Sequence, residues 1–435
     1  MKAGKQAGSR YWLLIIMLLL LQLSAGCDAV FPDPVDASED SYQHSETVQA
    51  DTESSEPAGM TPKKPERLRL AVVGDLMVHG PQIRAQQQSD GSYDFHNNFD
   101  FVRPWLQEAD IVLGNLETTF GGAERGYSSF PRFNTPDAFG EALKEAGFTA
   151  VSTVNNHTID TGSEGFFRTL EVLKQQGLTA IGTRDSQEEP YWHLFTENGI
   201  TLGVTAVSYE TPRAYGRRTL NALVIPRDLE GLINSFDYHT LEADLVPVKE
   251  QIAAMKEAGA DVTVVLIHWG EEYQQRQNPW QARIANALAA AGADLILGSH
   301  PHVLQPVRSI QRDPESTPSW VVYSLGNFLS NQRFEILRHH ESEDGVILFV
   351  NLIRDPDHQV TIIENVSYQP TWVHRYGRDG GMVYEIVPLI EALESPEAYH
   401  LITEESRRRA ENSLERSLAV WDNLPLARRQ SAFED

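Results

Sequence analysis

The chain has 435 residues, of which 41% are apolar and 22% charged, a composition typical of a globular protein. Its 36 basic and 61 acidic residues give a net charge of −25 at pH 7. This balance argues against nucleic-acid binding, which requires a basic surface. A single cysteine, Cys27, excludes an intramolecular disulfide and any metal site with several Cys ligands.

The first 27 residues are predicted to be a secretory signal. Three basic residues precede the apolar run Tyr11–Leu21, and small residues follow it. The sequence Leu23-Ser24-Ala25-Gly26-Cys27 resembles the bacterial lipoprotein box, in which the cysteine is lipidated, although Ser24 stands where Leu is usual. An uncleaved anchor and an ordinary cleaved signal remain alternatives. We therefore expect a membrane-anchored protein of the cell envelope, outside the cytoplasmic membrane.

Three further regions follow the signal. Residues 28–66 are rich in Ser, Pro, Asp and Glu and have too few apolar side chains to form a core, which predicts a disordered acidic tether. Residues 67–375 are predicted to form the main domain. Residues 376–435 are predicted to be a C-terminal, mostly helical extension, because the chain becomes helical and highly charged after about Pro388.

From Leu68 onward, short apolar runs alternate with helical patterns that stop at glycine. We predict buried strands over residues 68–73, 111–113, 150–154, 201–207, 262–267, 295–297 and 320–323. Helices are predicted over residues 138–146, 165–176, 248–258 and 282–291, each followed by the glycine that commonly ends a helix. The alternation favours an α/β protein with a largely parallel sheet covered on both faces. Residues 346–350 and 360–363 are instead typical of an antiparallel pair.

Polar side chains suited to metal binding follow five of the seven predicted strands. They stand in Gly74-Asp75, Asn115-Leu116-Glu117, Asn155-Asn156-His157, His268-Trp269-Gly270 and Ser299-His300-Pro301-His302. Because sites in open α/β sheets assemble at the carboxyl ends of strands, we expect these side chains to share one edge. Each alone could be a turn or a cap, but together they favour a metal centre with oxygen and imidazole ligands.

Six motifs occur in the order and spacing of a known family. They are Gly74-Asp75-Leu76-Met77, Asn115-Leu116-Glu117, Asn155 to Gly162, His268 to Tyr273, Gly298 to Val303 and Tyr323 to Phe328. Over about residues 67–375 the chain resembles the bacterial capsule-synthesis proteins of the CapA type, associated with poly-γ-glutamate, within the calcineurin-like metallophosphoesterase superfamily. The resemblance implies an α/β fold with a layered β-sheet core covered by helices.

The resemblance also implies a centre of two divalent metal ions, Mn, Fe or Zn. Asp75 and His302 would bind the first ion, and Glu117 would bridge the two. The second ion would have three further ligands: Asn156, His268 and His300. Phosphoesterases usually begin Asp-x-His, but Met77 stands where that His is expected, which leaves the first ion one ligand short unless His79 substitutes.

A catalytic role is implied for His157, which would act beside the metals as a general acid or as a donor to the developing oxyanion. Asp160 would orient its ring, or would instead cap the helix that follows. Four residues are expected to line the substrate pocket: Asn134, Glu272, Tyr273 and Asn327. A solvated loop remains the alternative for Glu272 and Tyr273. Asn134 stands where Arg is common in the family, which makes a strongly anionic substrate less expected.

Three functions remain open at this point. The first is a metal-dependent capsule-biosynthesis component acting on an amide-linked or phosphorylated polymer intermediate. The second is an extracytoplasmic metallophosphatase acting on a small phosphoester. The third is a non-catalytic, metal-binding subunit of a polymer-export complex. The expected partners are the membrane, through the N-terminal lipid or anchor, and capsule polymer synthesis or export subunits.

Overall fold

The structure is a computed structural model that describes residues 65–312, 314, 317–355, 357–427 and 429. The predicted signal, Cys27 and the tether up to residue 64 lie outside these residues. The chain divides into residues 1–61 and a second unit, Pro62–Asp435, which is the one described below. None of the helices in the described part of the chain is both long and apolar enough to span a membrane.

The first sheet contains eight strands. Seven lie side by side in the order β18 (Gly381–Pro388), β17 (Val360–Arg378), β16 (Asp344–Asp355), β1 (Glu66–Leu76), β2 (Ile111–Leu116), β3 (Ala150–Ser152) and β4 (Thr179–Ile181). The eighth, β15 (Asn327–Leu329), pairs with the end of β1. Strands β1 to β4 are parallel to one another. On the other side of β1, the pairs β1/β16, β16/β17 and β17/β18 are each antiparallel.

The second sheet contains seven strands. Six follow the order β10 (Ser235–Phe236), β6 (Ile200–Tyr209), β11 (Val262–His268), β12 (Leu295–Ser299), β14 (Ser319–Leu325) and β13 (Leu304–Ile310). The seventh, β5 (Trp192–Glu197), pairs with β6. A separate small sheet is formed by β7 (Thr211–Ala214), β8 (Arg217–Leu220) and β9 (Leu223–Val224).

Nine α-helices lie in the described residues. They are α1 (Gly80–Ala85), α2 (Arg103–Leu106), α3 (Ala138–Ala146), α4 (Gly162–Gln175), α5 (Leu241–Glu257), α6 (Pro279–Ala290), α7 (Phe334–Leu337), α8 (Leu389–Glu394) and α9 (Glu404–Val420). Local sequence explains several of their ends. Gly147 adopts a φ of +112° directly after α3, and the Asn278 side chain accepts a hydrogen bond from Gln281 N at the start of α6.

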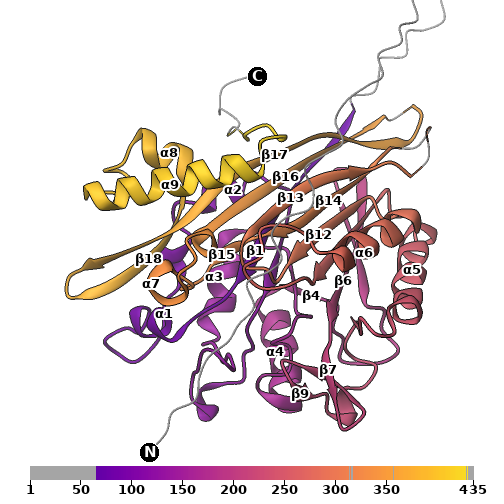
Figure 1. Cartoon of the computed structure of the whole chain (residues 1–435), viewed down its shortest axis with the longest axis horizontal. Helices are drawn as coiled ribbons and strands as arrows, with labels where there is room; N and C mark the ends of the chain where they lie inside the picture. The colour runs from indigo at the N-terminus through magenta and orange to yellow at the C-terminus, as the bar shows by residue number, and fades with distance from the viewer. Residues whose placement is uncertain (1–64, 313, 315–316, 356, 428, 430–435) are drawn as a thin grey trace, which may run out of the picture. The chain divides into compact units, whose positions relative to one another are not determined.

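The two large sheets face each other across the main apolar core, which includes Val72 of β1 and Val264 of β11, both fully buried. The outer face of the first sheet packs against residues of α3 and α4, and the outer face of the second against α5 and α6 (Figure 1). Helices α8 and α9 pack on β17 and β18 (Figure 1). Both sheets are therefore buried on both faces, which explains the almost unbroken apolar runs of their central strands.

The predicted α/β class with a layered sheet core covered by helices is confirmed. The largely parallel sheet covered on both faces forms as two mixed sheets, and each of them covers the inner face of the other. Burial on both faces produces the same apolar pattern whether a helix or a second sheet supplies the cover. The predicted boundary at residue 376 falls inside β17, and the C-terminal region begins with the rest of that strand and β18 before its two helices.

Candidate metal centre and active site

The side chains predicted to bind metal meet where strands of both sheets end. Asp75 lies near the end of β1, Glu117 directly follows β2, and Asn156 follows β3 in the first sheet. In the second sheet, His268 is the last residue of β11, and His300 and His302 follow β12. All six are buried, with at most 5% of their surface exposed. The strand-end argument therefore predicted these residues, but they come from two facing sheets and not from one edge of a single sheet.

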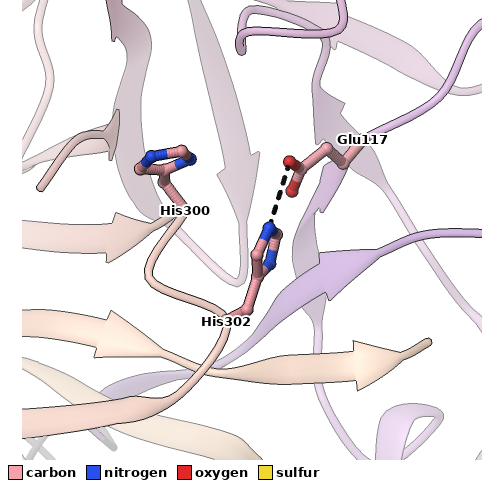
Figure 2. Close-up of side chains that lie close together, drawn as sticks. All are labelled: Glu117, His300 and His302. Carbon is pink, nitrogen blue, oxygen red and sulfur yellow. Dashed lines mark ion pairs between the residues drawn. The ribbon is translucent and has the colours of Figure 1, made fainter. Parts of the chain in front are cut away.

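Glu117 belongs to two groups of three ligand residues. One group contains Asp75, Glu117 and His268, and the other Glu117, His300 and His302, and within each group one atom per residue lies within 4.8 Å of the others. Figure 2 shows the second group, with the His302 ring facing the Glu117 carboxylate. Glu117 Oε1 lies 3.7 Å from Nε2 of both His268 and His302. The groups pair His268 with Asp75, whereas the resemblance assigned it to the other ion.

Hydrogen bonds hold this cluster in place. His302 Nδ1 lies 2.9 Å from Asp75 Oδ2, and the Asn115 amide donates to Asp75 Oδ1 at 2.8 Å and to Glu117 Oε2 at 3.3 Å. His268 Nε2 lies 2.8 Å from Asn156 Oδ1. Apart from His300, each of the six side chains is thus oriented by a neighbour, as metal ligands generally are.

Burial perturbs the pKa values of the cluster in the metal-free protein. Burial, followed by the charges of Asp75 and Glu272, raises the pKa of Glu117 well above its usual range. Burial and the neighbouring imidazoles lower the pKa of His268 and of His300 far below the ordinary value. These two rings are therefore neutral at pH 7, the state in which an imidazole nitrogen can bind a metal.

Two further observations indicate that these side chains can bind divalent cations. Glu117 Oε1 and His300 Nδ1 are buried and have no hydrogen-bond partner among the described residues, a costly state for polar atoms unless a ligand binds them. His300 and His302 also adopt positive φ angles of +96° and +56°. Such strained backbone is concentrated at functional sites. Oxygen and imidazole donors of this kind suit Mn, Fe or Zn.

His157 and Asp160 form a hydrogen-bonded pair beside the cluster. His157 Nδ1 lies 2.7 Å from Asp160 Oδ2, which also accepts a bond from Phe133 N at 2.6 Å. The N-cap residue of α4 is Thr161, so the contact that Asp160 makes is with the ring and not with the helix end. This is the geometry expected if Asp160 orients His157.

A cavity of about 330 Å³ lies beside these residues. It is lined by His157 and His302, by the predicted pocket residues Glu272 and Tyr273, and by Met77, His79, Phe130, Asn331, Gln332, Ile336 and Leu337. Phe130 and Ile336 are 71% and 58% exposed, so apolar side chains flank the opening. Among its described lining residues there is no Lys or Arg.

The other two predicted pocket residues do not line this cavity. The Asn134 side chain accepts from Gly121 N at 2.7 Å and donates to Gly122 O and Gly126 O, so it fastens its own loop. Asn327 donates to His302 O at 3.2 Å and to Ser342 O at 2.8 Å. Asn327 therefore supports the backbone of His302 and lies outside the lining of this cavity.

Several residues of the site were not assigned from the sequence. Asn115 bridges Asp75 and Glu117 although only its place in a motif was noted. The Tyr209 ring packs against His300 with centroids 4.7 Å apart, and the Asn221 amide reaches Asp160 Oδ1 at 3.5 Å. The contact of Asn115 with the site could have been predicted, because Asn115 stands two residues before Glu117 and alternate strand residues point the same way. Asn221 comes from the turn between β8 and β9, and no sequence signal connects it to the site.

Comparisons with known proteins show the family of the chain. The model of the family described as "Bacterial capsule synthesis protein PGA_cap" matches residues 69–332. "Capsule biosynthesis protein CapA" of Bacillus anthracis is 27% identical over 301 residues, which cover 65% of this chain and 66% of that protein, just under two thirds of its length. "PGA biosynthesis protein CapA" of Bacillus subtilis (strain 168) is 28% identical over 288 residues, 64% of this chain and 69% of that protein.

Among solved structures, a novel phosphatase from Mycoplasma pneumoniae matches 71% of this chain and 94% of its own, with 14% identity and a TM-score of 0.38. This likeness is too distant to add to the architecture described above.

Proposed function

Since the chain belongs to the bacterial capsule synthesis protein family PGA_cap, we propose that it is a metal-dependent hydrolase or transferase of poly-γ-glutamate-type capsule biosynthesis or export. The names of its two Bacillus relatives support the pathway. The observation that carries the chemistry is Glu117, which is shared by two ligand groups next to a cavity that also contains His157. A carboxylate in this position is suited to bridging two cations.

The ligand residues would be Asp75, Glu117 and His268 for one cation, and Glu117, His300 and His302 for the other, with Asn156 next to His268. Bound divalent ions supply Lewis-acid polarisation of the scissile carbonyl or phosphoryl bond and activate water. Asn115 orients Asp75 and Glu117 through its amide, and Asp75 orients His302.

His157 supplies the proton transfer in this proposal. Asp160 is a carboxylate acceptor, so the proton of the neutral His157 ring lies on Nδ1 and is donated to Asp160. The other nitrogen, Nε2, is left for the cavity, where it can take a proton from the nucleophile or return one to the leaving group. Asp160 stabilises the charged ring that forms between these two transfers.

The charge of the cavity does not distinguish an amide-linked γ-glutamyl polymer from a small phosphomonoester, since both are anionic, and the names of the two Bacillus relatives are what favours the polymer. The described lining of the cavity contains the Glu272 carboxylate and no Lys or Arg to balance further anionic groups.

We also propose that the protein acts outside the cytoplasmic membrane, held there through Cys27 and near the subunits that synthesise or export the polymer.

The test combines metal analysis with turnover on γ-glutamyl polymer and on model phosphoesters, each with added Mn²⁺. We expect roughly one to two equivalents of metal in the wild type, and loss of both metal and turnover when His300 and His302 are replaced by Ala together. His157→Ala should keep its metal and lose turnover. Full metal occupancy in the double variant would refute the site. Normal polymer production by cells carrying His157→Ala would favour a non-catalytic export subunit.

A further inference from the structure

His79 lines the cavity but has no part in the function proposed above. From the sequence it was a possible replacement for the ligand that Met77 cannot provide. In the structure it belongs to neither group that contains Glu117. It is the N-cap residue of α1, and its ring packs against the edge of Phe133 with centroids 5.3 Å apart. A polar ring on the cavity wall, outside the metal cluster, is positioned to contact a substrate.

The hydrogen bonding of His79 determines where its proton lies. The backbone N–H of Asn331 donates to His79 Nδ1 at 3.2 Å. A backbone amide can only donate, so Nδ1 is an acceptor and the neutral ring carries its proton on Nε2. Burial, followed by the charge of His302, lowers the pKa of His79 to about 4, which keeps the ring neutral at pH 7. With Asn331 donating to Nδ1, Nε2–H is the donor that the ring can offer to the Gln82 side chain or to a ligand.

The two imidazoles of the wall therefore have opposite roles. His157 donates its Nδ1 proton to Asp160 and leaves an unprotonated Nε2, whereas His79 leaves a protonated one. Phe133 lies against both rings, at 5.3 Å from His79 and 4.8 Å from His157. The wall thus combines a site that exchanges protons with a fixed hydrogen-bond donor.

The position of Asn331 is set by the C-terminal part of the chain. The Tyr384 hydroxyl donates to Asn331 Oδ1 at 3.1 Å, and Tyr384 is only 1% exposed. Tyr384 belongs to β18, which lies beyond the residues 69–332 that match the family model. A strand outside the matched region therefore holds the group that sets the tautomer of His79.

We propose that His79 is a substrate-binding residue that donates an Nε2–H hydrogen bond to an uncharged oxygen acceptor, such as an amide carbonyl, and that Tyr384 is its positioning residue. The assignment rests on the proposed function, because it takes the cavity as the substrate site. A neutral donor suits an uncharged acceptor. A second carboxylate at this point would face Glu272 with no Lys or Arg among the described lining residues to balance it.

Three variants of the full chain, in detergent and loaded with Mn²⁺, test the proposal. His79→Met removes the donor at similar length, His79→Gln retains an N–H near the position of Nε2, and Tyr384→Phe removes the hydroxyl that bonds Asn331 and Arg375. The probe is a γ-glutamyl tripeptide, with binding measured by calorimetry. A neutral hydrogen bond corresponds to roughly a 2- to 10-fold change in affinity. We expect that loss in His79→Met, partial recovery in His79→Gln, and unchanged metal content in all three.

The tautomer gives a second readout that does not depend on binding. In ¹⁵N-histidine spectra, the signals absent from His79→Gln identify His79, and they should show a proton on Nε2 and none on Nδ1. Tyr384→Phe should produce a mixture of tautomers. A proton on Nδ1 in the wild type, equal affinity in wild type and His79→Met, or loss of metal from His79→Met would each overturn the assignment. Failure of the metal-loaded wild type to bind the tripeptide would refute the proposed function, and this assignment with it.

Discussion

Replacing Glu117 by glutamine tests the shared carboxylate, because the change should have opposite effects on the metal-free and metal-loaded protein. Asn115 Nδ2 lies 2.8 Å from Asp75 Oδ1 and 3.3 Å from Glu117 Oε2. Two negative charges on these oxygens are therefore no more than about 6 Å apart and repel each other by roughly 3 kcal/mol at an effective dielectric constant of about 20. Glutamine keeps the shape of the side chain and removes this repulsion.

The direction of the stability change in the metal-free protein follows from the raised pKa of Glu117. Burial and the neighbouring carboxylates disfavour the charged form in the folded protein, so the penalty is absent below the ordinary carboxyl pKa and grows as the pH rises through the raised pKa. Without metal, Glu117→Gln should therefore be more stable than the wild type at pH 8, by up to roughly 3 kcal/mol. With metal at about 100 times its dissociation constant, the wild type gains roughly 2.7 kcal/mol and the variant should gain little.

Urea denaturation at pH 8, with EDTA or with Mn²⁺, measures both effects. Glu272→Gln is the matched control, since it makes the same chemical change in a cavity residue that belongs to neither ligand group, and its response to metal should resemble that of the wild type. If Glu117→Gln retains the full stabilisation by Mn²⁺, Glu117 is not a ligand and the shared-carboxylate reasoning fails.

Three other predictions concern separate parts of the molecule. Asp160→Ala should lower turnover on the order of 10²- to 10⁴-fold with unchanged metal content, because His157 loses its acceptor and with it the group that fixes its tautomer; unaltered turnover would contradict the orienting role. Burial lowers the pKa of His374 to about 4, so the unfolded chain takes up the proton first, and this residue should cost up to roughly 3 kcal/mol of stability as the pH falls from about 6.5 to 4. His374→Gln should flatten that part of the stability curve, measured by urea midpoints at each pH, and an equally steep curve in the variant would refute the assignment. Cys27→Ser should abolish labelling with a radioactive acyl chain and leave a slower-migrating precursor, whereas an unlabelled wild type that retains Met1 would disprove lipidation.

Most of the candidate site could be predicted from the sequence because its ligands stand at the ends of short apolar runs. The carboxyl ends of neighbouring parallel strands lie at one edge, so Asp75 could be expected beside Glu117, and His268 beside the His300–His302 pair. That these two groups meet depends on the two sheets facing each other. Helix ends were also predictable where a local signal exists, as at Gly147 after α3. The start of α5 lies seven residues before the prediction, since Pro247 stands inside its second turn. Leu241 and Leu245 nevertheless continue the buried stripe of Val248 and Ile252.

The family, the α/β class and the residues of the candidate metal site could thus be read from the sequence, because strand periodicity and strand-end chemistry are local properties of the chain. That two sheets face each other could be seen only in the folded molecule, since an apolar strand does not specify what covers it. The folded molecule also shows that Asn134 fastens a loop and that Asn327 supports His302. The tautomer of His79 depends on Asn331 and, through it, on Tyr384, about 300 residues further along the chain. Such contacts join segments that only the packing of the sheets brings together, and no local pattern encodes them.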